Sequence, residues 1–175
     1  MTIGVIVALS NREQRTMKYI ALQDFDRAWI FRHKDLPVAS DDLEQIKPYS
    51  EAVSNQLWNQ YISPNAGHPS QFGHGDWPSR NGVWQEGAPD WQQCWELDEP
   101  DMPAELLAHL DWDDNTVVLF FYDCDRVIET RWSVFKRCWK NFLFFDDGPI
   151  LVGKKRKQVV QFRQSGDFLL GTKPE

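Results

Sequence analysis

The sequence has few cysteines, and the three that it has are widely spaced. Cys94, Cys124 and Cys138 form no C-x-x-C pair, the spacing typical of zinc knuckles and redox dithiols. We therefore predict free, buried thiols in a reducing compartment. A chain of 175 residues is also long enough to bury a core that needs no covalent cross-link.

Long apolar runs are also missing. Ile3 to Leu9 is apolar, but it is too short to span a membrane, and no basic residues precede it as they would in a signal peptide. The sequence therefore predicts a cytoplasmic protein that does not associate with membranes. Because Met17 resembles an alternative start, residues 1–16 are expected to be a dispensable tail. Residues 17–175 are expected to form a single domain.

Several catalytic motifs are absent as well. The chain has no serine-centred nucleophile elbow, no glycine loop that would cradle phosphate and no helical H-E-x-x-H pair. We therefore predict no catalytic residues and no cofactor, and favour a binding protein over an enzyme.

One local pattern supports an alternative hypothesis. Asp123-Cys124-Asp125 follows a hydrophobic run, and Phe120 to Val127 resembles the D-x-D motif of haloacid-dehalogenase-like phosphatases. That motif also occurs in nucleotide-sugar transferases. Both families need more chain than the fifty residues that follow Asp125. The alternative is a metal-dependent hydrolase or transferase centred on Asp123 and Asp125. The simpler interpretation is that these acids form a turn and cap the next helix.

Two other clusters have simple structural interpretations. His68, His74 and Asp76 could supply metal ligands, but zinc sites commonly use tighter and better-framed spacings. Lys154 to Lys157 could contact phosphates, yet the run lies between two expected strands and is typical of a solvated hairpin tip. We therefore predict neither a metal site nor nucleic-acid binding.

Basic residues are scarce in the middle of the chain. Residues 41–125 hold seventeen Asp or Glu and two Lys or Arg, a net charge of −15. Residues 126–175 hold eleven Lys or Arg and five acids, a net charge of +6. Such a split usually marks a charged face, and an acidic face suits a basic protein as partner.

Tryptophan, by contrast, is abundant. Nine are present, and four of them lie within residues 63–100, a stretch punctuated by Gly and Pro. We expect this stretch to be an ordered loop that folds back onto the body, with at most a short helix near 90–96. A second alternative follows, in which Trp77, Trp84, Trp91 and Trp95 form stacking faces of a glycan-binding module.

The fold class is predicted to be α+β, with a small, mainly antiparallel sheet and a long amphipathic helix packed on it. The helix is expected over about residues 129–145, where aromatic residues recur every three or four positions, and Ile128 would extend this stripe. Thr116 to Tyr122 is an unbroken apolar run, expected to be the central strand.

Shorter elements complete the prediction. Later strands are expected over 149–152, 158–163 and 167–171, with a hairpin turn at 165–167. Helices are expected over 24–31 with Trp29 facing inward, from Asp41, over 48–62 from Pro48, and over 104–110.

The C-terminal third carries a family resemblance. The pattern W-x2-F-x3-W-x2-F from Trp132, followed by Asp-Asp-Gly-Pro-Ile-Leu-Val and Gly-Asp-Phe-Leu-Leu-Gly, resembles a family of uncharacterised bacterial proteins known only as a domain of unknown function. This resemblance extends from Met17 to the end and implies no activity. More distantly, about forty residues are similar to bacterial toxin-immunity proteins, which implies a small acidic protein that masks the basic surface of a toxin.

These observations predict a non-enzymatic protein that binds another protein, possessing an acidic face for steering and Trp residues as anchors. The predicted anchors are Trp91 and Trp95. The predicted acids are Glu96, Asp98, Glu99, Asp101, Asp111, Asp113 and Asp114.

Overall fold

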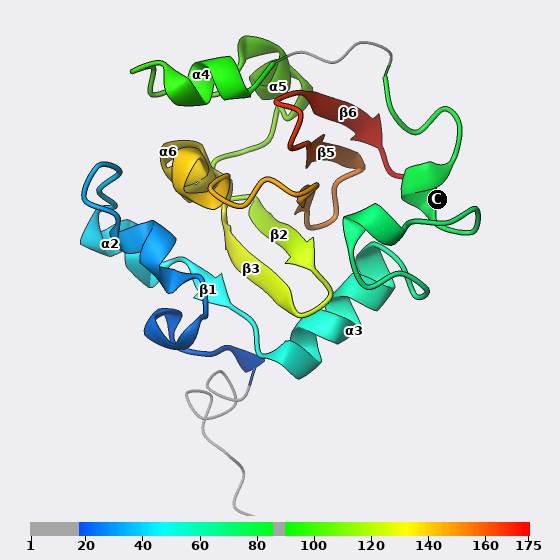
Figure 1. Cartoon of the computed structure of the whole chain (residues 1–175), viewed down its shortest axis with the longest axis horizontal. Coiled ribbons are helices and arrows are strands. Elements are labelled where there is room, and N and C mark those ends of the chain that lie inside the picture. The colour runs from blue at the N-terminus through cyan, green and yellow to red at the C-terminus, as the bar shows by residue number, and fades with distance from the viewer. Residues whose placement is uncertain (1–17, 86–89) are drawn as a thin grey trace, which may run out of the picture.

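The protein is a single α+β domain, seen in a computed structural model that describes residues 18–85 and 90–175. Its centre is a six-stranded antiparallel sheet of order β1-β3-β2-β4-β5-β6 (Figure 1). The strands are β1 (Lys47–Pro48), β2 (Val117–Asp123), β3 (Arg126–Arg131), β4 (Ile150–Gly153), β5 (Gln158–Phe162) and β6 (Phe168–Thr172). The α-helices are α2 (Ser40–Glu44), α3 (Glu51–Tyr61), α4 (Gln92–Glu96), α5 (Ala104–His109) and α6 (Trp132–Phe142). The expected dispensable tail lies outside the described residues.

The predicted strands β2, β4, β5 and β6 are confirmed. β2 lies between β3 and β4, and its residues 118–122 are buried because both faces of the sheet are covered. Gly166 forms the turn between β5 and β6 at φ +94°, a backbone conformation that glycine adopts without steric cost.

The predicted limits of the amphipathic helix are wrong. Residues 126–131 form strand β3, so Ile128 belongs to the sheet, and α6 runs only from Trp132 to Phe142. The physical reason is that Val127, Ile128 and Thr130 are β-branched and pair with β2 across a tight turn. The aromatic stripe itself is confirmed within the shorter helix, where Trp132, Phe135, Trp139 and Phe142 are buried.

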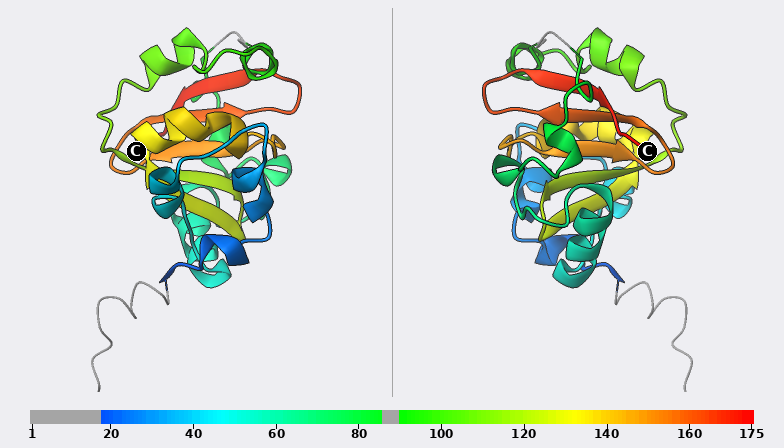
Figure 2. Two further views of the ribbon diagram at one scale, coloured as in Figure 1. Left: turned by 90° about the vertical axis from the view of Figure 1, so that its left-hand side faces the viewer. Right: turned by 90° about the vertical axis from the view of Figure 1, so that its right-hand side faces the viewer.

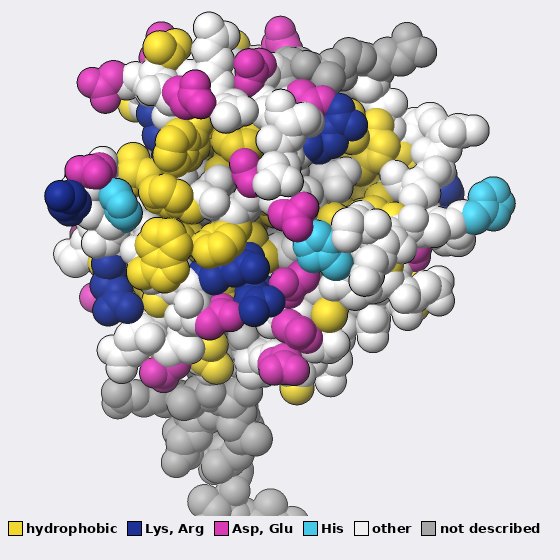
Figure 3. All heavy atoms as spheres, in the orientation of Figure 1, with side chains coloured by type: hydrophobic (Ala, Val, Ile, Leu, Met, Phe, Trp, Pro, Cys, Tyr) yellow, Lys and Arg dark blue, Asp and Glu magenta, His cyan; other side chains and the backbone are white. Residues whose placement is uncertain are grey.

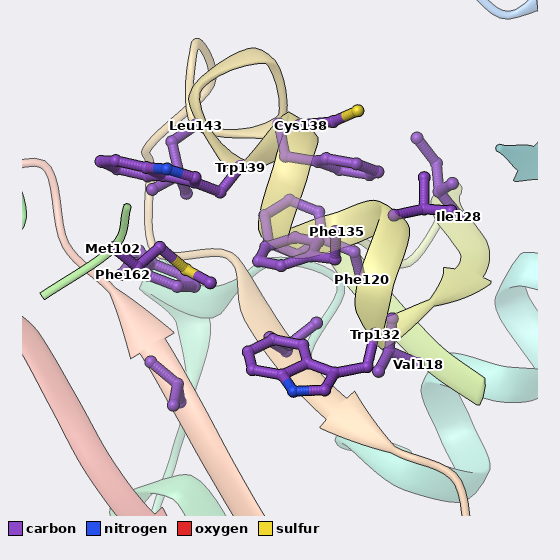
Figure 4. Close-up of a cluster of buried hydrophobic side chains, with 14 of the residues drawn as sticks. Met102, Val118, Phe120, Ile128, Trp132, Phe135, Cys138, Trp139, Leu143 and Phe162 are labelled. Carbon is purple, nitrogen blue, oxygen red and sulfur yellow. The ribbon is translucent and has the colours of Figure 1, made fainter. Parts of the chain in front are cut away.

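Two hydrophobic layers enclose the sheet, since side chains alternate between its faces. On one face Val118, Phe120 and Ile128 pack against α6, as Figure 4 shows together with Trp132, Phe135 and Trp139. On the other face Leu119, Phe121 and Val127 pack against Trp58 of α3 and the loop that follows it. Figure 2 shows α6 and α3 on opposite sides of the strands.

The N-terminal region differs from expectation in two places. Pro48 lies in the edge strand β1, where its missing N–H is tolerated, and α3 starts at Glu51 behind the N-cap Ser50. Residues 22–32 form two short 3₁₀ turns, η1 (Leu22–Asp24) and η2 (Ala28–Arg32), in place of one α-helix. Trp29 points outward and is 50% exposed, contrary to its expected inward position.

The long loop folds back onto the sheet as predicted. Within its described part, the Trp84 backbone bridges to Gly171 of β6, and Trp77 and Trp84 pack with ring centroids 6.0 Å apart. The expected short helix is α4. No helix among the described residues has the length and apolar character to cross a membrane.

Candidate functional site

Four aromatic residues from three segments of the chain form a partly exposed cluster, here called the aromatic surface: Trp29, Trp95, Phe144 and Phe145. Phe144 lies at its centre, with its ring centroid 5.7 Å from that of Trp29 and 5.4 Å from that of Trp95. The ring of Phe145 lies 5.9 Å from that of Trp29. Figure 3 shows hydrophobic side chains gathered on this face of the molecule.

Local backbone geometry places these rings. In η2, Ala28, Ile30 and Phe31 are buried, and the tight 3₁₀ winding turns the intervening Trp29 to the surface. Phe144 and Phe145 follow the C-terminal end of α6, after Leu143 has filled the last core position. The aromatic surface therefore lies at the C-terminal end of β2, where Tyr122 packs edge-on against Phe145.

One cation covers part of the aromatic surface. The Arg27 guanidinium lies 4.0 Å from the centroid of Phe145 and 5.1 Å from that of Tyr122. The neighbouring Arg126 is held by carboxylates, with bonds of 2.8 Å to Asp26 and 2.7 Å to Asp123. A hydrogen bond from Arg126 lowers the pKa of Asp26. The charge of Arg126 is therefore engaged by carboxylates within the fold, whereas the guanidinium of Arg27 lies against the aromatic surface.

The two predicted anchors have different environments. Trp95 is half-buried, donates its indole N–H to the Lys140 carbonyl at 2.8 Å and belongs to the aromatic surface. Trp91 is only 2% exposed, packs edge-on against Phe162 and donates to the Arg163 carbonyl at 3.2 Å. Trp91 is therefore not a surface anchor, because α4 docks on the β5–β6 hairpin through this side chain.

The seven predicted acids are exposed, and they form two groups along the sequence. Glu96, Asp98, Glu99 and Asp101 follow Trp95 in sequence and border the aromatic surface, beside Leu97, which is 48% exposed. This segment is fixed to α6, since Lys140 donates to the Leu97 carbonyl at 2.8 Å and Trp139 to the Pro100 carbonyl at 2.9 Å.

The second group precedes β2 at its other end: Asp111, Asp113 and Asp114. Asp114 pairs with Lys136 at 2.6 Å, and this bond lowers the pKa of Asp114. Asp113 accepts from the backbone of Asn115 at 2.8 Å. The single acidic face therefore stays a prediction, since the two groups contact α6 at Lys136 and Lys140, one turn apart, and only Asp114 among the seven acids forms an ion pair within the described residues.

The D-x-D residues form the hairpin turn between β2 and β3. Asp123 accepts from the backbone of Asp125 at 2.9 Å and from Arg126, while Asp125 accepts from Asn55 at 2.9 Å. The predicted turn is confirmed, but a strand follows it, so neither acid caps a helix. Asp125 also lines a hollow of about 260 Å³ with Asp24, Asp26 and Glu51. Among the described residues, no group of three or more acids, His or Cys is placed to hold a metal ion.

The structure does not bring His68, His74 and Asp76 together as ligands. His68 pairs with Asp147 at 3.2 Å, and His74 is exposed. Asp76 is buried and accepts from the Ser63 hydroxyl and from the Gly73 backbone. Burial acts to raise the pKa of Asp76, but these hydrogen bonds outweigh it and the pKa lies below its ordinary value. Asp76 therefore stabilises the loop.

The loop tryptophans do not offer a row of open rings. Trp77 is 8% exposed and Trp91 2%, while Trp84 is half-buried. The indole N–H groups of Trp77 and Trp84 donate to the carbonyls of Tyr61 and Pro78. The buried rings of Trp77 and Trp91 therefore cannot act as the stacking faces that the glycan-binding hypothesis requires.

Sequence reasoning missed a polar cluster on the α3 side of the sheet. The carboxylate of Glu129 accepts from the hydroxyls of Tyr19, at 2.6 Å, and Tyr49, and the two tyrosine rings stack at 4.8 Å. Burial acts to raise the pKa of Glu129, but the two hydroxyls and nearby lysines outweigh it and the pKa is lowered. Only recognition of residues 126–131 as a strand would have placed Glu129 on this face.

A family model described as a protein of unknown function (DUF2947) matches residues 19–171, which is most of the chain. No curated protein matches the chain. No solved structure matches it either.

Proposed function

We propose that this chain, which belongs to the DUF2947 family of proteins of unknown function, acts by binding another protein through its aromatic surface. The observation that carries this proposal is the exposure of Trp29 beside Trp95, Phe144 and Phe145. Contiguous apolar patches on a protein surface, when large, often mark binding sites. Trp and Arg are also enriched among the residues that dominate binding energy at interfaces.

Charge at the border of the aromatic surface favours a basic partner. Glu96, Asp98 and Glu99 are exposed next to Trp95, and no ion pair engages them within the described part of the chain. A lysine or arginine of the partner would meet these carboxylates or lie over the exposed ring of Trp29. The net charge of −7 would also speed association with a positively charged surface.

Masking of a toxin is the more specific form of this proposal. It is supported by the likeness of the C-terminal third to immunity proteins and by the acidic border. Growth of cells that express the binding partner alone, or together with this chain, tests it. Toxicity relieved by co-expression would support the immunity role. A partner that is harmless alone would reject that role and leave the binding proposal intact.

Affinity capture from native cell extract tests the binding proposal. Tagged wild-type protein is compared with Trp29→Arg, which places a charge on the aromatic surface. Gln56→Arg is the matched control, since it adds the same charge at an exposed position of α3. We expect wild type and Gln56→Arg to retain one stoichiometric basic protein that dissociates as salt rises. Equal retention by Trp29→Arg would refute the proposed surface.

A further inference from the structure

A second concave region lies at the other end of strand β2. This hollow, here called the basic hollow, has a volume of about 640 Å³ and is lined by Tyr61, Thr116, Val117, Lys154, Lys155 and Arg156. Its volume falls within the range of about 300–1,000 Å³ that is typical of small-molecule sites. The seven residues of β2 separate it from the aromatic surface by about 20 Å at roughly 3.3 Å per residue.

Three consecutive cations line the basic hollow. In an extended strand, consecutive side chains would point to opposite faces of the sheet. Here Lys155 adopts φ +59° between β4 and β5, and this bend allows Lys154, Lys155 and Arg156 to border the same space. Lys157, the next residue, instead pairs with Glu175 at 2.5 Å. No ion pair engages the three lining cations among the residues that the structure describes.

Thr116 forms part of the wall of the basic hollow. It is 9% exposed, and its hydroxyl oxygen is closed off from solvent in the part of the chain that the structure describes. A ligand in the hollow would therefore contact the cations and not this hydroxyl.

The remaining wall adds an aromatic ring and a further cation. Tyr61 presents a phenol ring, and the Lys173 ammonium lies 4.9 Å from its centroid. The carboxylate of Glu129, on the same face of the sheet, accepts from Tyr19 and Tyr49, and the nearby Lys154 ammonium helps to lower its pKa. Positive charge is therefore concentrated at this hollow in a chain whose net charge is −7.

We propose that the basic hollow binds a small molecule carrying two or more phosphate or carboxylate groups. Lys154, Lys155 and Arg156 would contact its anionic oxygens. The volume of this open hollow suits a small ligand, and the acidic remainder of the chain disfavours a long nucleic acid. This proposal is independent of the protein-binding role, because the two surfaces share no residue.

Isothermal titration calorimetry at low salt tests the proposal, with inorganic pyrophosphate and citrate as separate probes. Saturable one-to-one binding of pyrophosphate alone would assign the site to phosphate, and binding of citrate alone to carboxylate. We expect the double substitution Lys155→Gln and Arg156→Gln to weaken binding about tenfold or more, since hydrogen bonds to charged groups are lost. Lys157→Gln, the matched control on the same hairpin, should change affinity less than about twofold, in keeping with an exposed ion pair.

Absence of saturable binding to either probe would overturn the proposal, as would an equal loss in Lys157→Gln. Tighter binding of a single-stranded oligonucleotide than of both probes would also overturn it.

Discussion

The two ends of strand β2 carry opposite kinds of surface, although the same sheet supports both. At the C-terminal end, the aromatic surface is apolar and the neighbouring Arg126 is neutralised by Asp26 and Asp123. At the N-terminal end, the basic hollow gathers three cations that form no ion pair among the described residues, although Lys154 lies near enough to Glu129 to lower the pKa of that carboxyl. Charge along the sequence would place acid and base in different halves of the chain. In the fold, both surfaces draw on residues from both halves.

This difference shows where charge remains for binding. Asp42 of the acidic half is buried and pairs with Arg137 of α6 at 2.8 Å, and Asp114 pairs with Lys136. Such pairs cancel part of the imbalance within the molecule. The acidic border at Glu96 to Asp101 and the cationic border at Lys154 to Arg156 are among the charges that no ion pair engages in the described part of the chain.

The largest expected effect distinguishes Trp91, which supports the core, from Trp29, which lies on the aromatic surface. Trp91→Ala should lower the free energy of unfolding by about 3–5 kcal/mol, because it leaves a cavity between α4 and the β5–β6 hairpin. Trp29→Ala should cost less than about 1 kcal/mol, since half of that side chain already contacts solvent. Urea unfolding followed by circular dichroism measures both. Similar losses would show that Trp29 is a structural residue.

The next effect concerns partner affinity. With the purified partner, Trp29→Ala should weaken binding by about 2 kcal/mol, roughly thirtyfold, as expected for a central aromatic residue of an interface. Lys155→Gln, at the other end of β2, should leave that affinity unchanged. Surface plasmon resonance would give both values. A loss in Lys155→Gln as large as that in Trp29→Ala would mean that one partner spans both ends.

A third prediction concerns stability in acid at the polar cluster near the basic hollow. The pKa of Glu129 in the folded protein lies below its ordinary value of 4.5. Its ionised form therefore stabilises the fold above about pH 4.5, and this contribution is lost as pH falls through the lowered pKa. Glu129→Gln removes this titrating group. Between pH 6 and pH 3, the free energy of unfolding should therefore fall by about 1–2 kcal/mol less in the variant than in wild type.

Thermal melts at several pH values check this expectation, and Glu51→Gln, on the exposed first turn of α3, is the control. Parallel curves for wild type and Glu129→Gln would contradict the assigned role of the two tyrosine hydroxyls.

The smallest expected effect comes from the acidic border. Replacement of Glu96, Asp98 and Glu99 by their amides should slow association with a basic partner a few-fold at low salt, and the difference should vanish as salt rises. Asp111→Asn, at the other end of β2, should have no such effect. Stopped-flow association rates would compare the two variants. Equal slowing by both variants would show that the net charge of the protein sets the association rate and that the acidic border has no local effect.

Local periodicity explains which elements were predictable. The apolar run before Asp123, the aromatic spacing of α6 and the Ser165-Gly166-Asp167 turn each reflect contacts within a few residues, so they could be read from the chain. Strand β3 could not be predicted in this way, because Ile128 continues the spacing of three or four residues at which the aromatic side chains of α6 recur. Only pairing with β2 separates the two elements.

The sequence by itself determined the α+β class, the central strand, the ordered Trp-rich loop and the total charge, because these depend on composition and short-range pattern. The tertiary structure decided which tryptophans face solvent, which acids remain free of partners and which distant residues share a surface. Trp91 and Trp95 lie four residues apart, yet one fills the core and the other borders the aromatic surface. Burial and charge pairing are properties of neighbours in space, and a linear pattern does not contain them.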